Sequence, residues 1–327
     1  MPFDALVLRQ HEGKTQAQVE SLELDALPAG DVLIKVDYSS LNYKDGLAIT
    51  GKGKIVRDFP MVPGVDLAGE VVESEADAYP VGSQVILTGW SVGERYWGGY
   101  AQYMRVQSKW LVPLPDGLST REAMILGTAG LTAQLCVQRL QNAGITPDQG
   151  PVIVTGASGG VGSLAVSLLA QQGFKVHALS TKAQASAQLK ALGAEEVILW
   201  ADFMQEAPKM LEKSIWAAGV DTVGGDTLAK VLAQTQYNAC IAAVGLAQSP
   251  ALNTSVMPFI LRGASLLGVD SVMQPYAQRL AAWEALAKNM AREHLQSVAA
   301  EICLAELPEY AEAITEGKIR GRVLVKL

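Results

Sequence analysis

Two patterns of hydrophobic and polar positions divide the 327-residue chain. Through residue 120, short apolar and β-branched runs are separated by clusters of Gly and Pro, a pattern that is typical of strands and turns. These runs include residues 32–38, 67–72, 84–87 and 100–105. We therefore predict an irregular β-rich domain in this part of the chain.

From residue 151 onward, short apolar runs alternate with segments whose apolar residues recur at helical spacing. Strands are predicted at residues 152–155, 175–179, 197–200, 219–223, 239–245 and 265–269. Helices are predicted at residues 161–172, 183–192 and 227–235. This alternation predicts parallel crossovers, and therefore a doubly wound α/β sheet with helices on both faces.

The boundary between the two domains is predicted after the turn-rich stretch PLPDGLS, where Ala and Leu begin to recur at helical spacing. The last part of the chain has helical patterns at 276–290 and 307–315 and a strand-like end at 322–327. Because this tail is too short for a third domain, we expect it to complete the first one. The predicted domains are residues 1–121 with 271–327, and residues 122–270.

Composition and charge exclude several classes of protein. With 49% apolar and 18% charged residues, the chain has the composition of a folded protein and not of a disordered one. The net charge is −7 and no long basic run occurs, so we expect no nucleic-acid partner. No window reaches the ~18 consecutive apolar residues of a membrane span, and Asp4 and Arg9 interrupt the start of the chain where a secretion signal needs an apolar run. We expect no membrane partner and a cytoplasmic location.

A Gly-rich stretch, VIVTGASGGVGSLAVSLLAQQ, joins one predicted strand to the helix after it. Its glycines at 156, 159 and 162 differ from the usual dinucleotide fingerprint, because Ser158 stands at the second glycine position. Small residues there still let the backbone approach a pyrophosphate, and N–H groups at the helix start attract its charge. The alternative is a tight turn without a ligand.

The next strand ends in Ser180, Thr181 and Lys182. In an NAD site, an Asp or Glu near this position binds the 2′-hydroxyl of the ribose. Here two hydroxyl groups and an ammonium stand instead, and these groups suit a 2′-phosphate. The sequence therefore favours NADPH, with the alternative that Ser180 only caps a helix and Lys182 is only solvated.

Several stretches together resemble the medium-chain dehydrogenase/reductase superfamily, and within it the zinc-free branch of quinone oxidoreductases and acrylyl-CoA reductases. These stretches are SSLNYKDGLAITGKG, MVPGVDLAGEV, ILTGWSVGERYWGGYAQY, MILGTAGLTA, VTGASGGVGS and MPFILRGASLLGVDSVM. The resemblance covers nearly the whole chain. It implies a GroES-like β-rich catalytic domain beside a Rossmann domain that binds NADPH.

The zinc-dependent members of that superfamily carry Gly-His-Glu where this chain has Gly64, Val65 and Asp66, and a ligand Cys near Asn42. Zinc needs three or four convergent Cys, His or carboxylate ligands, and this sequence lacks that set. Its three cysteines fit neither a disulfide framework nor a metal spacing. We expect no metal.

The resemblance also implies contacts with the cofactor. It places Tyr43 and Thr128 beside the nicotinamide, residues Ser158, Gly159, Gly160 and Val161 at the pyrophosphate, and Ser180, Thr181 and Lys182 at the 2′-phosphate. It places Leu246, Ile260 and Ser271 along the nicotinamide side, with core packing as the alternative for Leu246 and Ile260. It also places Gly317 at the cofactor, at a position where relatives often have Asn.

A site with NADPH and no metal suits hydride addition to an activated alkene, such as the α,β-unsaturated thioester of acryloyl-CoA. The protein then aligns donor and acceptor and places donors at the developing oxyanion. The candidates are the Tyr43 phenol and the Asn42 amide, with the alternative that Tyr43 only packs against the ring. A quinone reductase and a non-catalytic NADPH-binding protein remain as alternative functions.

Two further features concern partners. Lys44, Lys52, Lys54 and Arg57 form a basic cluster that is either solvated or in contact with coenzyme A phosphates. The stretch ASLLGVDSV is suited to an edge strand, and pairing with a second copy of itself would protect that edge. We expect a homodimer, with the alternative that the C-terminal helix covers the strand.

Overall fold

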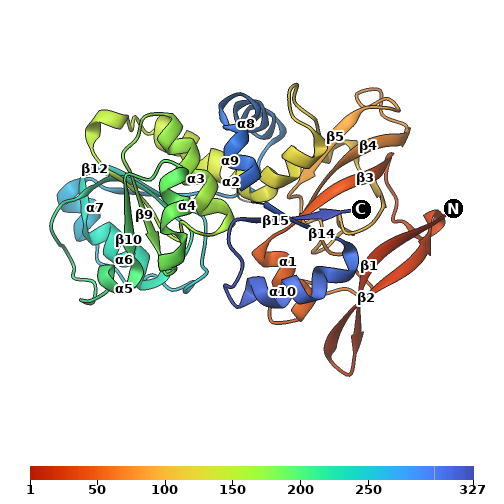
Figure 1. Cartoon of the computed structure of the whole chain (residues 1–327), viewed down its shortest axis with the longest axis horizontal. Coiled ribbons are helices and arrows are strands. Elements are labelled where there is room, and N and C mark those ends of the chain that lie inside the picture. The colour runs from red at the N-terminus through yellow and green to blue at the C-terminus, as the bar shows by residue number, and fades with distance from the viewer. Residues whose placement is uncertain (298) are drawn as a thin grey trace. The chain divides into compact units, whose positions relative to one another are not determined.

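The computed structural model describes residues 1–297 and 299–327, which form two compact units (Figure 1). The first unit comprises Met1–Thr128, Ser271–Lys288 and Val298–Leu327. The second comprises Ala129–Asp270 and Asn289–Ser297. Within the part of the chain that the structure describes, no helix is long and apolar enough to cross a membrane.

A seven-stranded sheet organises the first unit, in the order β14-β15-β3-β4-β5-β7 with β6 also paired to β3. The strands are β3 (Val32–Leu41), β4 (Asp66–Ser74), β5 (Gln84–Thr88), β6 (Tyr103–Val106), β7 (Leu111–Pro113), β14 (Ala299–Ile302) and β15 (Arg322–Lys326). A separate antiparallel hairpin consists of β1 (Pro2–His11) and β2 (Lys14–Glu23). The unit also contains α1 (Tyr43–Thr50) and α10 (Leu307–Thr315), and α8 (Tyr276–Asn289) begins in it.

Alternation along β3 supplies the core of the first unit, because successive side chains of a strand point to opposite faces. Val32, Ile34 and Val36 pack with apolar residues of β4 and β5 in one cluster. Leu41 joins a second cluster with β15, α1 and α10. The two helices approach so closely that a Cβ on Gly46 of α1 would lie 2.5 Å from Ile314 Cγ2 of α10.

The C-terminal strand lies next to β3 in this sheet. The two strands are antiparallel, with Leu324 opposite Ser40 and Val323 opposite Leu41. Arg322, at the start of β15, is therefore brought to the end of β3, where the chain turns into α1 at Asn42. Residues almost 300 positions apart in sequence meet here, as Arg322 and Ser40 do at a separation of 282.

The second unit contains a six-stranded parallel sheet in the order β10-β9-β8-β11-β12-β13. Its strands are β8 (Val152–Val154), β9 (Val176–Ser180), β10 (Glu196–Leu199), β11 (Trp216–Asp221), β12 (Thr235–Ala243) and β13 (Ser265–Gly268). Its helices are α3 (Gly160–Gln171), α4 (Ser186–Ala191), α5 (Trp200–Phe203), α6 (Gly225–Ala233), α7 (Met257–Arg262) and α9 (Arg292–Ser297), and α2 (Thr120–Asn142) extends into it. This strand order is that of a Rossmann fold. The predicted fold class is confirmed.

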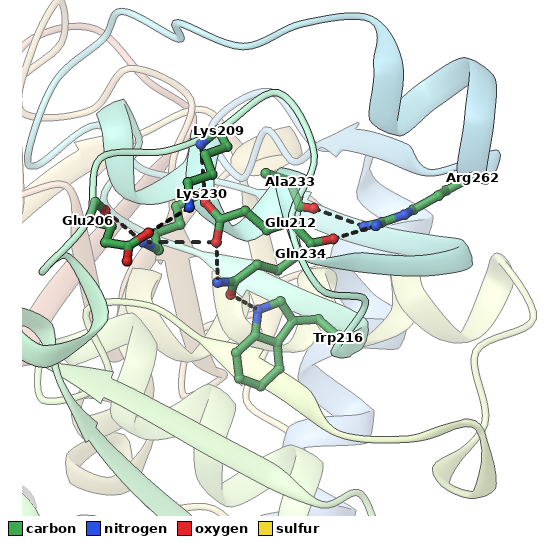
Figure 2. A network of polar contacts seen from close by, with 8 residues as sticks. All are labelled: Glu206, Lys209, Glu212, Trp216, Lys230, Ala233, Gln234 and Arg262. Carbon is green, nitrogen blue, oxygen red and sulfur yellow. Dashed lines mark hydrogen bonds and ion pairs between the residues drawn. The ribbon is translucent and has the colours of Figure 1, made fainter.

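Polar side chains satisfy backbone groups where several of these strands begin (Figure 2). Arg262 donates to the carbonyl oxygens of Glu212, Ala233 and Thr235. The Gln234 amide accepts a hydrogen bond from the Trp216 indole and donates one to Glu212. Buried backbone and side-chain groups are thereby paired, as a folded interior requires.

Candidate active site

The Gly-rich loop after β8 forms a cradle of small residues at the start of α3. Gly156 has a φ of 59°, and a Cβ there would lie 2.3 Å from Thr222 Oγ1. A Cβ on Gly162 would lie 2.4 Å from the Gly156 carbonyl oxygen, so this glycine lets the helix pack on the loop. The loop ends at the extended Gly159, after which the first N–H groups of a twelve-residue helix have no partner within the helix. These groups fit the pyrophosphate of a dinucleotide.

Ser180 connects this loop to the end of β9. Its buried hydroxyl donates to Ser158 Oγ at 3.0 Å and accepts from the Lys182 N–H at 3.0 Å. The structure thus brings together the segments predicted at the pyrophosphate and at the 2′-phosphate. The helix-capping alternative for Ser180 stays open, because its hydroxyl accepts from the N–H of Lys182, the residue before the turn Ala183–Ala185. The contacts of Ser180, Thr181 and Lys182 with a phosphate stay predictions.

Leu246 and Ile260 lie on the surface of the second unit, 61% and 71% exposed. The core-packing alternative for both residues is therefore wrong. Solvent-exposed apolar side chains are available to contact a ligand, and their predicted place on the nicotinamide side stays a prediction.

In the first unit, polar residues converge on the buried carboxylate of Asp66. Its Oδ1 accepts from the Ser40 N–H at 3.0 Å, and its Oδ2 accepts from the Thr128 N–H at 2.8 Å and from Asn42 Nδ2 at 3.1 Å. The Ser40 hydroxyl lies within 3 Å of both oxygens. Charge-assisted hydrogen bonds of this kind compensate the loss of hydration on burial.

The Arg322 guanidinium completes this group of residues. It donates to Ser40 Oγ at 2.6 Å, to the Ile125 carbonyl at 2.9 Å and to Asn42 Oδ1 at 3.3 Å. Burial lowers the Arg322 pKa, and the neighbouring Asp66 charge opposes that effect. We name Ser40, Asn42, Asp66 and Arg322 the Asp66 cluster.

Close packing around the Asp66 cluster explains a break in α2. Gly127 has φ 50° and ψ −152°, which interrupts the helix. A Cβ there would lie 2.6 Å from Ser40 Oγ and 2.7 Å from Asp66 Oδ2, so only glycine fits. The break aims the N–H of Thr128 at Asp66.

Tyr43 occupies the first turn of α1, where its side chain is 42% exposed. The helix start is fixed by Asp45, whose carboxyl group accepts from the Asn42 N–H at 2.9 Å and from the Val65 N–H at 3.0 Å. Asn42 itself is held by Asp66, Ser40 and Arg322. Its amide N–H groups already face protein acceptors, which favours a positioning role over the predicted donor role.

Sequence reasoning missed Ser40, Asp45, Tyr100 and Arg322 in this site. The Asn-x-x-Asp spacing of Asn42 and Asp45 resembles a helix capping box and offered a signal. Tyr100 is fully buried and donates to the Ser40 carbonyl at 3.1 Å, and burial raises its pKa well above the usual value. For Tyr100 and Arg322 the sequence carried no signal, because their partners are remote along the chain.

Two predicted residues take backbone roles. Gly317 ends α10 with a φ of 69°, and its N–H donates to the Ile314 carbonyl. Glycine and Asn are the two residues that most often adopt the left-handed conformation after a helix. Gly317 in place of the family's Asn is therefore compatible with this helix end. Ser271 lies in the segment after the second unit's last strand, and its carbonyl is held by Arg279.

These residues do not fit a zinc ion. Val65 cannot ligate, and both oxygens of Asp66 accept hydrogen bonds from protein groups. Among residues 1–297 and 299–327, no group of three or more His, Cys, Asp and Glu is arranged to hold a metal ion.

Asp45 makes stability depend on pH. Burial and the nearby Asp66 charge raise its pKa from 3.8 to about 7, against the lowering effect of its two backbone donors. Between pH 4 and 7 the folded chain therefore keeps a proton that the unfolded chain has lost, and the free energy of unfolding falls as pH rises. Asp45→Asn should remove this decline, on the order of a few kcal/mol, from urea-unfolding curves across that range. Asp116→Asn, in an exposed turn, is the control and should keep it. An equal slope in both variants contradicts the assignment.

Comparison with known proteins identifies the family. Residues 28–116 match the model of the alcohol dehydrogenase GroES-like domain, and residues 160–288 match that of the zinc-binding dehydrogenase family. The chain is 52% identical to the probable acrylyl-CoA reductase AcuI of Escherichia coli over 325 residues, which cover 99% of this chain and all of that one. It is 43% identical to the putative quinone oxidoreductase YhfP of Bacillus subtilis, with 99% of each chain covered.

A solved structure agrees with this result. The yhdH oxidoreductase of Salmonella enterica, crystallised with NADP, is 54% identical and superposes with a TM-score of 0.97 over 99% of both chains. The family that the motifs predict is confirmed. The chain belongs to the medium-chain dehydrogenase/reductase superfamily, in its zinc-free branch of acrylyl-CoA reductases and quinone oxidoreductases.

Proposed function

We propose that this protein reduces the activated C=C bond of a short α,β-unsaturated acyl-CoA with NADPH, converting acryloyl-CoA to propanoyl-CoA without a metal. The observation that carries this proposal is the likeness to the probable acrylyl-CoA reductase AcuI, which extends over both units at 52% identity. The glycine cradle and the Ser158–Ser180 contact support the NADPH part of it.

When bound, NADPH supplies a hydride for the β-carbon of the substrate, and the electrons of the C=C bond move to the thioester oxygen. The residues of this chain hold the partners in place. Ser158, Gly159, Gly160 and Val161 would bind the pyrophosphate, while Tyr43, Thr128 and Ser271 would face the nicotinamide. A proton then reaches the α-carbon from solvent or from the Tyr43 hydroxyl. Positioning of this kind accounts for much of the rate of a reaction whose substrate is already electrophilic.

The basic cluster of Lys44, Lys52, Lys54 and Arg57 would bind the phosphates of coenzyme A. Lys44 forms an ion pair with Glu94 at 2.7 Å, and Lys52 forms one with Glu312. Lys54 and Arg57 are exposed in the segment after α1. Lys54 and Arg57 are therefore the candidates for contact with coenzyme A phosphates, and solvation of the whole cluster is the alternative.

We also propose a cytoplasmic homodimer. The edge strand β13 and the exposed apolar Leu261 of α7 support pairing of two copies. The free thiols Cys136, Cys240 and Cys303 suit a reducing compartment. A monomer by light scattering at micromolar concentration would contradict the dimer.

Steady-state NADPH oxidation with acryloyl-CoA, crotonyl-CoA and a benzoquinone tests the activity. We expect the highest kcat/KM with acryloyl-CoA. The likeness to YhfP favours quinone reduction as the second candidate, and a higher kcat/KM with the benzoquinone would replace the proposal by it. Cofactor binding without turnover of any acceptor would instead indicate a non-catalytic NADPH-binding protein.

Lys182→Ala tests the choice of cofactor. We expect the variant to weaken NADPH binding by ~1–3 kcal/mol and to leave NADH binding nearly unchanged, because only NADPH carries the 2′-phosphate. Calorimetric titration with each cofactor measures both affinities. Lys175→Ala, which removes an exposed lysine at the other end of β9, should change neither. Equal losses for NADPH and NADH would refute the assignment.

Tyr43→Phe separates the two roles of the phenol. Because addition to an activated alkene needs little charge stabilisation, we expect less than about a tenfold loss of kcat, and we expect Tyr43→Ala to raise the KM for NADPH. Initial-rate kinetics measures both, with Tyr237→Phe, 74% exposed in the second unit, as the control. A hundredfold or greater loss in the Phe variant at unchanged NADPH affinity would show that the hydroxyl stabilises the oxyanion.

A further inference from the structure

Arg279 of α8 is a fully buried arginine in the first unit, 1% exposed. Its Nη1 donates to the carbonyl oxygen and to the hydroxyl of Thr88, each at 2.7 Å. Its Nη2 faces the carbonyl oxygens of Ser271 at 3.3 Å, Val272 at 3.1 Å and Gln274 at 3.4 Å. One guanidinium thus joins the end of β5 to the segment 271–274.

The turn after β5 is shaped to receive that segment. The Trp90 N–H donates to the Val272 carbonyl at 2.9 Å, and the Trp90 ring lies 5.0 Å from the Arg279 guanidinium. A Cβ on Gly89 would lie 2.6 Å from the Val272 carbonyl oxygen. Trp90 and Ser91 both have positive φ, at 56° and 60°. Non-glycine residues hold this conformation at a cost, and such strain concentrates at functional sites.

Thr88 also connects this arrangement to the Asp66 cluster. Thr88 and Asp66 are direct partners in the antiparallel ladder of β5 and β4. Asp66 binds Asn42 and the Thr128 N–H, and Thr88 binds Arg279, which holds the Ser271 carbonyl. The strand partners Asp66 and Thr88 therefore hold the segments that carry the first unit's predicted nicotinamide contacts.

We propose that Arg279 is a positioning residue for hydride transfer, which fixes the segment 271–274 so that Ser271 keeps its place beside the nicotinamide. The inference rests on the proposed function, because that function puts Ser271 at the nicotinamide. The rigid fork of a guanidinium reaches acceptors in several directions at once, whereas a lysine ammonium is a compact charge on a flexible stem. The site offers five acceptors on two segments, and a guanidinium can reach them where an ammonium cannot.

A purely structural arginine would affect the whole molecule, whereas a positioning residue affects one end of the cofactor. Adenosine 2′,5′-bisphosphate carries the adenine and the 2′-phosphate of NADPH and lacks the nicotinamide. Its affinity therefore reports on the second unit alone, while kcat and the fluorescence of bound NADPH report on the nicotinamide end.

The test compares Arg279→Met with Lys230→Met. Lys230, in α6 of the second unit, is also a buried cation that donates to a backbone carbonyl, that of Glu206 (Figure 2). For Arg279→Met we expect kcat with the best acceptor of the wild type to fall about tenfold or more. We also expect a changed emission of bound NADPH and an affinity for adenosine 2′,5′-bisphosphate within about twofold of wild type. Lys230→Met should leave all three readouts within about twofold.

A milder pair covers the case in which Arg279→Met fails to fold. Thr88→Val removes one acceptor of Arg279, and Thr235→Val removes an equally buried hydroxyl of the second unit. Thr88→Val should lower kcat at unchanged affinity for adenosine 2′,5′-bisphosphate, and Thr235→Val should not. The proposal is overturned if kcat falls no more than in the matched controls, or if the affinity for adenosine 2′,5′-bisphosphate falls by the same factor as kcat. Wild-type protein that fails to oxidise NADPH with any acceptor would instead refute the proposed function.

Discussion

The first unit depends on the burial of one carboxylate, that of Asp66. A carboxylate removed from water costs several kcal/mol unless its oxygens receive hydrogen bonds and a positive charge lies close by. Ser40, Asn42 and the Thr128 N–H supply the donors, and Arg322 supplies the charge. Each of these residues is thereby held in one position. Residues from before α1, from the break in α2 after Gly127 and from the start of β15 therefore meet at this group.

The same region shows how the fold works without a metal ligand set. Zinc-dependent members of the superfamily use the residues near this position as ligands, and here Val65 supplies only its backbone N–H, to Asp45. Asp66 directs its lone pairs at neighbouring protein groups. What remains is a set of fixed side chains around an exposed Tyr43, which is an arrangement suited to orienting a reactive substrate.

Much of the second unit could be predicted from the sequence, because its strands and helices follow from local patterns of apolar residues. Alternating apolar runs and helical segments gave the strands of the Rossmann sheet, and the glycines gave the loop before α3. The predicted helix at 183–192 is shorter, since its first residues form a 3-10 turn before Ser186–Ala191. The Asp66 cluster could not be predicted in the same way. Ser40 and Arg322 meet across 282 positions, and nothing in the stretch that contains Ser40 points to a partner so far along the chain. Long-range polar contacts leave no periodicity in a sequence.

The distribution of charge also bears on the chemistry. The two charged groups of the Asp66 cluster, Asp66 and Arg322, are buried and both bind Ser40 and Asn42, so they fix geometry and leave little charge to stabilise an oxyanion. An acyl transfer would need donors aimed at the reacting oxygen, since removing one such donor costs about 10²–10³ in rate. Hydride addition to an α,β-unsaturated thioester places its developing negative charge on the carbonyl oxygen of the thioester. That carbonyl is already conjugated with the C=C bond. Alignment of the two reacting carbons is then the larger requirement, and a rigid polar cluster that holds Asn42 and Thr128 meets it without a metal or a dedicated acid. Substitutions of the residues that set the geometry of the site should therefore lower kcat more than substitutions of the residues that bring charge to it.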